Sequence, residues 1–180
     1  PWKYVWQKLP FFMESPGPLG LLVTIRHLLT ISSQKGYRRI LILEDDVCFH
    51  RHFTSLFAKI IPTLPSWKLL YLGCSMHTWR YRERCRAHPT YWVPRGSVPG
   101  AFALGIDASV FSELFYHVNT LRSPWDLGPL RAINQKYHGQ VIVTRPHLAI
   151  ADVRQSDNRG AKTLPQKAHD CGWNVSHYVI

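Results

Sequence analysis

Acidic residues are scarce in this sequence. There are 11 of them against 22 lysines and arginines in 180 residues, which gives a formal net charge of +11. Such a charge attracts polyanions: nucleic acid, anionic membrane surfaces or phosphorylated small molecules. The range 79–95, WRYRERCRAHPTYWVPR, interleaves basic and aromatic side chains, which suits a groove that binds phosphates and stacks rings. A charged surface that serves solubility, with an ordinary exposed loop at 79–95, is the simpler alternative.

Long apolar runs are also lacking. No window reaches the roughly 18 uninterrupted apolar residues that a transmembrane helix needs, so none is expected. No basic segment followed by a small-residue cleavage site opens the sequence, so no signal peptide is expected either. These absences predict a soluble domain and leave its compartment open.

Paired cysteine motifs, repeats and low-complexity segments are absent as well. Cys48, Cys74, Cys85 and Cys171 show no CxxC spacing, which argues against a zinc ribbon or a thioredoxin-type site and leaves two disulfides open. Without a repeat or a domain boundary, we expect one domain over residues 1–180. Residues 1–16 form an atypical N-terminal segment of it, and residues 158–180 a polar C-terminal tail.

What the sequence does contain is an alternation of helical and strand patterns. Helices are predicted at 19–34, ending at Gly36, and at 52–61, 108–118 and 123–137; short aliphatic strands are predicted at 39–43, 68–72, 101–105 and 140–144. The range 76–99 has no clean period and predicts a long loop. The alternation favours a three-layer α/β/α domain around a mixed, mostly parallel sheet of Rossmann-like type.

Three of the few acids stand side by side after the best predicted strand. Glu44, Asp45 and Asp46 follow the run RILIL at 39–43. Ligands of open α/β sheets bind at the carboxyl ends of strands, and three adjacent carboxylates repel one another unless a cation compensates them. Oxygen ligands suit Mg²⁺ or Mn²⁺. In extended geometry Glu44 and Asp46 point the same way, so they can share one ion.

Two structural alternatives explain the triplet without a ligand. The acids can cap the helix predicted from residue 52, where its dipole favours negative charge. They can also form salt bridges with Arg38 and Arg39. Phosphatases and receiver domains also combine a strand with acids, so the pattern alone names no reaction.

Several motifs together resemble the glycosyltransferases of family 25, the lipooligosaccharide and procollagen galactosyltransferase group. The matching features are Gly20, Thr24, Gly36, the run ILILEDDV at 40–47, YLG at 71–73, GAFALGIDASVF from Gly100, PWD at 124–126, RPHLA at 145–149, and Ser156. The resemblance covers about residues 17–157. It departs from the family at Thr24-Ile25, where the family has Ser-His. No N-terminal strand is found before Gly17, so either the chain is truncated or residues 2–12 supply that strand in altered form.

This resemblance implies a GT-A fold and a metal-dependent transfer of a sugar from a nucleotide-sugar donor, usually a UDP-sugar, to a hydroxyl acceptor. It implies that Glu44 and Asp46 hold Mn²⁺ or Mg²⁺ against the donor diphosphate, with Asp45 on the metal or the ribose. Further candidates are Asp126 as the base for the acceptor hydroxyl, His147 or Asp152 as a third metal ligand, and Arg154 and Ser156 near the diphosphate.

Other functions remain open from the sequence. The basic aromatic range 79–95 predicts a nucleic-acid-binding module, or a transferase whose acceptor is DNA or another polyanion. The missing N-terminal strand also fits an inactive glycosyltransferase-like scaffold. The acceptor of an active transferase is a glycan, a protein or another hydroxyl compound, and the oligomeric state is not predicted.

Overall fold

The computed structural model describes residues 16–75, 85–152, 154 and 164–180. They form an α/β domain with a sheet of six strands and a second sheet of two strands. The six-stranded sheet runs, in spatial order, β1 (Arg39–Leu43), β6 (Ala103–Asp107), β3 (Leu69–Tyr71), β7 (Val141–Thr144), β5 (Tyr91–Pro94) and β4 (Cys85–Ala87). The small sheet pairs β2 (Val47–Phe49) with β8 (Ala149–Ala151) in antiparallel orientation. The α/β class and the mixed sheet are thus confirmed.

The prediction of a mostly parallel sheet is wrong. β3 and β7 are the one parallel pair among the described strands. β1 and β3 do run in the same direction with a helix between them, as the alternating pattern predicts. However, β6 inserts between them and pairs antiparallel with both. The local pattern predicts this strand, at 101–105, but it does not predict the place of the strand in the sheet, because strand neighbours are selected by contacts between distant segments.

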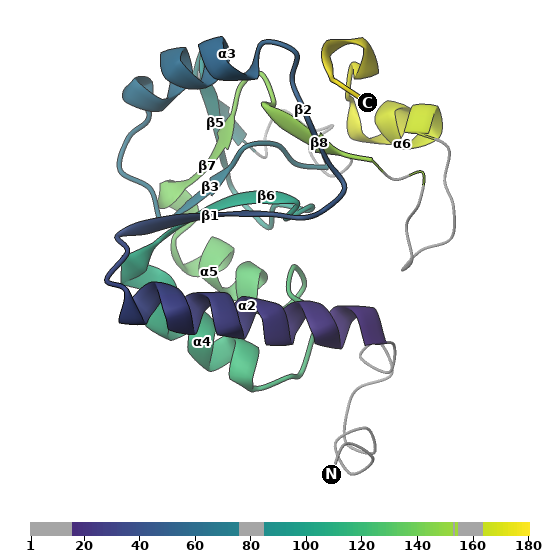
Figure 1. Cartoon of the computed structure of the whole chain (residues 1–180). Helices are drawn as coiled ribbons and strands as arrows, with labels where there is room; N and C mark the ends of the chain where they lie inside the picture. Colours follow the sequence, from purple (N-terminus) through teal and green to yellow (C-terminus); the bar gives the residue numbers. More distant parts are fainter. Residues whose placement is uncertain (1–15, 76–84, 153, 155–163) are drawn as a thin grey trace.

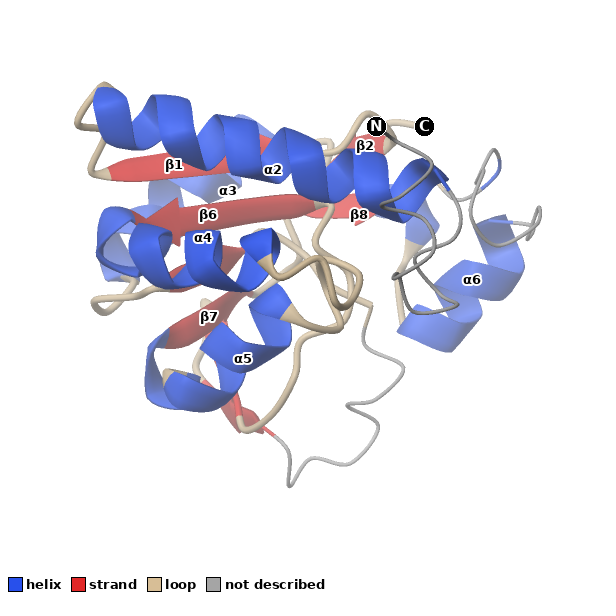
Figure 2. Ribbon diagram, turned by 90° about the horizontal axis from the view of Figure 1, so that it is seen from below, coloured by secondary structure: helices blue, strands red, loops and turns tan. Residues whose placement is uncertain are grey.

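Helices cover both faces of the large sheet (Figures 1 and 2). One face packs against α2 (Pro16–Gln34), α4 (Phe111–Asn119) and α5 (Pro129–Lys136); the other packs against α3 (Phe53–Ile60), α6 (Leu164–Cys171) and the small sheet. Short 3₁₀ helices lie at Ile61–Thr63, Ala108–Val110, His138–Gln140 and Val175–His177. The domain therefore has two apolar cores, one on each face of the large sheet.

The first core shows why residues 16–34 form a helix. Leu22, Ile25 and Leu29 recur at helical spacing and are at most 1% exposed. Each such side chain contributes about 1.5–3 kcal/mol by burial. The helix ends where Gly36 adopts a φ of 66° and Tyr37 N donates to Ser32 O over 3.0 Å. The left-handed conformation of Gly36 lets the next N–H group donate to a carbonyl of the last helical turn, as is common where a helix ends at glycine.

The range 76–99 and the residues after Ser123 are among the regions that differ from the sequence-based expectation. The range predicted as a loop contains the hairpin of β4 and β5, while its residues 76–84 lie outside the described part. The helix predicted from Ser123 begins only at Pro129, because residues 125–128 form turns in which Gly128 N donates to Pro124 O over 3.0 Å.

The C-terminal residues 164–180 pack into the second core. Leu164, Cys171 and Trp173 are buried, and Trp173 Nε1 donates to Cys74 O over 2.9 Å. Tyr178 also reaches inward, donating from its hydroxyl to His147 O over 3.0 Å. The expected polar tail is therefore, in its described part, a structural element of the domain. None of the described helices is long and apolar enough to span a membrane.

Candidate functional site

The acidic triplet lies where β1 leaves the sheet. Glu44 N still donates to Phe102 O over 2.9 Å, which continues the ladder between β1 and β6 by one residue. Asp45 and Asp46 then form a turn that leads into β2. The extended geometry assumed for residues 44 to 46 is therefore wrong, because the chain turns toward the small sheet. Asp152 N donates to Asp46 O over 2.7 Å and ties this turn to the end of β8.

Electrostatic strain is concentrated in this turn. Burial, together with the charges of Asp46, Asp126 and Asp45, raises the pKa of Glu44 to about 7. Burial also raises the pKa of Asp46, with added repulsion from Asp45 and Asp152. The Asp46 Oδ1 atom is buried without a hydrogen-bond partner among the described residues. A buried carboxylate oxygen without a partner is costly, and a bound cation would offset that cost.

The two structural alternatives for the triplet do not hold. The residue that caps α3 is His52, and β2 separates this helix from the acids. Arg39 pairs with Asp107, with 3.3 Å between Nε and Oδ2. Neither helix capping nor this arginine explains the clustered acids.

Asp126 reaches the same region from another part of the chain. The turn that carries it is anchored by Trp125, which is 2% exposed. It is also tight at Gly128, where a Cβ atom would lie 1.5 Å from Ser123 Oγ. The Asp126 charge contributes to the raised pKa of Glu44. The structure thus brings Asp126 near Glu44, in the turn before α5 rather than within the helix predicted at 123–137.

His147 has different neighbours. Its ring is 5% exposed, its Nε2 lies 3.7 Å from Cys74 Sγ, and it packs edge-on against Trp92 with 5.2 Å between ring centroids. Burial lowers its pKa to about 4, so the imidazole is neutral. A neutral imidazole has the charge state of a metal ligand, but these contacts place His147 beside Cys74 and Trp92 rather than the triplet. Asp152 is the later residue that the backbone holds against Asp46.

Asp152 already has a cationic partner. Arg154 Nε donates to its two carboxylate oxygens over 2.9 and 3.0 Å, and this pairing lowers the pKa of Asp152. Arg154 therefore lies close to the acidic turn, and its guanidinium geometry also suits a phosphate. Asp45 is exposed at the rim of the turn. Ser156 lies outside the described residues.

A divalent cation fits this donor set in part. The described residues contain no group of three or more His, Cys, Asp and Glu side chains arranged to hold a metal. Mg²⁺ and similar ions, however, are commonly held by one or two carboxylates, with water and substrate phosphates completing the shell. Glu44 and Asp46 offer that minimum, and the buried Asp46 Oδ1 still lacks a partner. The residues present therefore fit a metal that is shared with a phosphorylated ligand.

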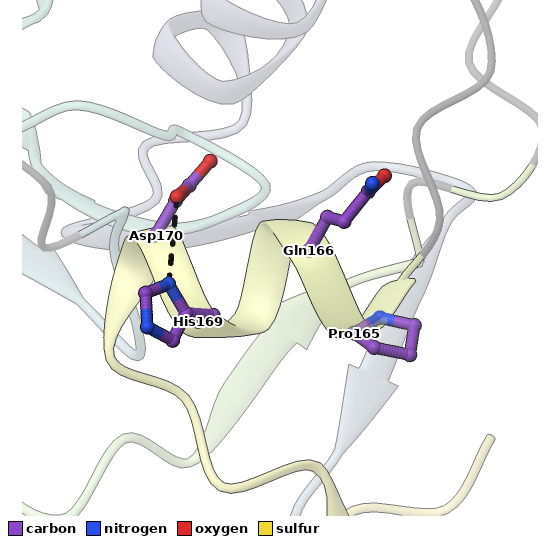
Figure 3. Close-up of a pocket in the computed structure, with 4 residues that line it drawn as sticks. All are labelled: Pro165, Gln166, His169 and Asp170. Carbon is purple, nitrogen blue, oxygen red and sulfur yellow. Dashed lines mark ion pairs between the residues drawn. The ribbon is translucent and has the colours of Figure 1, made fainter.

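Two pockets lie elsewhere on the molecule. A pocket of about 590 Å³ adjoins α6 and is lined by Pro165, Gln166, His169 and Asp170 (Figure 3). A second pocket, of about 450 Å³, lies between α2 and α4, where Leu29 and Phe111 contribute to its lining. Neither is lined by residues of the acidic triplet. His169 and Asp170 form an exposed pair with 3.8 Å between Nδ1 and Oδ1, which does not distinguish the first pocket as a catalytic site.

Comparison with known proteins adds no identity to this geometry. No family model matches the chain, and no curated protein matches it. The fold and the acidic cluster therefore define an α/β protein with a candidate cation site at a strand end.

Proposed function

We propose that this protein is a metal-dependent glycosyltransferase. It would move a sugar from a nucleotide-sugar donor, a UDP-sugar, to a hydroxyl of a glycan, a protein or a polyanionic acceptor. The observation that carries the proposal is the half-buried cluster at the end of β1, where the charge of Asp126 contributes to the raised pKa of Glu44 and Asp46 Oδ1 has no hydrogen-bond partner among the described residues. The sequence motifs that resemble family 25 glycosyltransferases support the same reaction.

In this proposal Glu44 and Asp46 hold Mn²⁺ or Mg²⁺, and Asp45 lies at the rim toward the ribose. The bound cation offsets the negative charge that grows on the departing nucleoside diphosphate. Asp126 accepts the proton of the acceptor hydroxyl, which requires an ionised carboxylate near the reacting atoms. Arg154 would contact a phosphate oxygen; its guanidinium pairs with Asp152, whose backbone N–H donates to Asp46 O, and this supports the role.

The test is calorimetric titration of UDP with and without Mn²⁺. We expect binding to the wild-type protein that depends on Mn²⁺. Asp46→Asn should weaken it by at least about 100-fold, beyond the 10–100-fold typical of losing an outer-shell partner. Asp170→Asn serves as the matched control, because Asp170 lies on α6 with its side chain 52% exposed. Binding that is unaffected by Mn²⁺ or by Asp46→Asn would exclude the proposed role of this cluster.

A further inference from the structure

Strand β1 has an open edge. It is the last strand of the large sheet and, among the described strands, pairs with β6 alone. Glu44 N donates to Phe102 O, and Ala108 N donates to Arg38 O, so even-numbered residues direct their backbone groups at β6. Because these groups alternate in an antiparallel pair, the backbone N–H and C=O groups of Arg39, Leu41 and Leu43 face the open edge.

The side chains on this edge do little to protect it. Leu41 is 47% exposed and Leu43 is 45% exposed. Natural edge strands are usually shielded by charges, prolines or bulges. The one charge within β1, Arg39, is engaged with Asp107 and lies over the Trp67 ring, with 4.5 Å between Cζ and the centroid. Within the part of the chain that the structure describes, the edge therefore presents unpaired backbone groups beside Leu41 and Leu43.

Charges at the two ends of β1 indicate what can pair with it. Arg38 and Arg39 stand at its start, and Glu44 and Asp45 follow its end. In a parallel arrangement, a second copy of this strand would place like charges side by side. In an antiparallel arrangement it places opposite charges side by side. The strand is therefore complementary to itself in the antiparallel direction alone.

We propose that β1 pairs antiparallel with β1 of a second copy of this chain, about a two-fold axis at Leu41. The open groups belong to odd-numbered residues, so only odd positions can form the hydrogen-bonded pairs. Full overlap of residues 39–43 then places Leu41 opposite its own copy. This is the self-complementary interface that a two-fold dimer requires.

The same register pairs the charges. Arg38 comes to lie opposite Glu44 of the partner subunit, at a position without backbone hydrogen bonds, where opposing side chains approach most closely. Glu44 has three acidic neighbours in its own chain that raise its pKa. The second copy therefore supplies a cation to the acidic turn. The dimer itself does not depend on the glycosyltransferase proposal.

Sedimentation velocity tests the dimer. We expect a species of twice the 20.9 kDa chain mass as concentration rises into the micromolar range. Leu41→Lys should abolish it, because two lysines would meet at the axis. Leu127→Lys is the control, since Leu127 is 58% exposed outside β1. Arg38→Glu and Glu44→Arg should each weaken the dimer about tenfold, and the double variant should restore it.

Cross-linking tests the register independently of folding effects. Leu41→Cys should form an intermolecular disulfide on mild oxidation, because opposing Cα atoms lie about 5.5 Å apart in such a pair. Leu43→Cys, at a similarly exposed position, should not form this disulfide. In the proposed register residue 43 lies opposite residue 39 of the partner subunit, four residues along the strand from the partner's residue 43. A wild-type monomer would overturn the proposal. A dimer that survives Leu41→Lys would also overturn it. Slow hydrogen exchange of the amides at 39, 41 and 43 in the monomer would overturn it too, because it would mean that another segment of the chain covers this edge.

Discussion

Carboxylates at the two ends of β1 have pKa values that are shifted in opposite directions. At its start, Asp107 accepts hydrogen bonds from Ser109 N over 3.1 Å and from Arg39 Nε over 3.3 Å. Burial acts to raise the pKa of Asp107, but these bonds outweigh it and the pKa is lowered. At the other end, Glu44 and Asp46 have raised pKa values. A structural acid is thus stabilised in its charged form, whereas the acids of the candidate site are not.

This difference separates the site from ordinary surface acids. Glu113 behaves like Asp107, because Lys136 and Tyr137 donate to it over 2.8 and 3.0 Å and its pKa is lowered despite burial. Perturbed pKa values gather at functional sites, where charge is held ready for a ligand. Variants of Glu44, Asp46 and Asp107 test this contrast between the two ends of β1.

The largest effect is expected for Glu44→Gln. The pKa of Glu44 lies at about 7 in the folded protein against 4.5 in the unfolded chain, so folding favours its protonated form. Its contribution to stability is full below pH 4.5 and is lost as the pH rises through 7. The rise in the pKa of Glu44 on folding corresponds to about 3 kcal/mol of stability. Relative to wild type, Glu44→Gln should therefore become more stable by up to that amount between pH 4.5 and 8, as measured by urea unfolding.

A stability difference between the two proteins that does not change with pH would contradict this prediction. Asp107→Asn offers a comparison in the same measurement, since its pH dependence should have the opposite sign. The two curves together would show whether the two ends of β1 differ as the structure indicates.

The next effect concerns Mn²⁺. A cation that binds the folded site stabilises it by about 2.7 kcal/mol at a hundredfold excess over Kd. We expect Mn²⁺ to raise the Tm of the wild-type protein and to leave the Tm of Asp46→Asn unchanged, as followed by calorimetry. Equal shifts in both proteins would place any bound metal elsewhere.

The smallest effect is expected at the start of β1. Asp107 caps the 3₁₀ helix at Ala108–Val110, with its side chain accepting from Ser109 N. Asp107→Asn keeps the cap but loses the charge, whereas Asp107→Ala loses both. We expect about 1 kcal/mol of destabilisation for Asp107→Ala and less for Asp107→Asn at pH 7 by urea unfolding. Because the pKa of Asp107 is lowered, its contribution is present above about pH 4 and is lost as the pH falls. No change in either variant would mean that Asp107 has no capping role.

The sequence determined the features that depend on neighbouring residues. The helix at 19–34, which in the structure begins earlier, at Pro16, its end at Gly36, the strand at 39–43 and the position of the acids after that strand all follow from local spacing and composition. Glu44, Asp45 and Asp46 are adjacent, so their mutual repulsion needs no structure to be recognised. The strands β2 and β8 have three residues each and are too short to show a period. The sequence therefore did not predict that Asp152 follows a strand, β8, that pairs with β2.

Only the tertiary structure decided which distant residues meet. The insertion of β6 beside β1, the approach of Asp126 to Glu44, the contact between Asp152 and Asp46, and the placement of His147 beside Cys74 join segments far apart in the chain. Such contacts are selected by burial and by backbone hydrogen bonding across the whole fold. The local sequence supplies the charge, and the fold determines its surroundings: Arg39 and Ser109 donate to Asp107, whereas Asp46 Oδ1 is buried with no hydrogen-bond partner among the described residues.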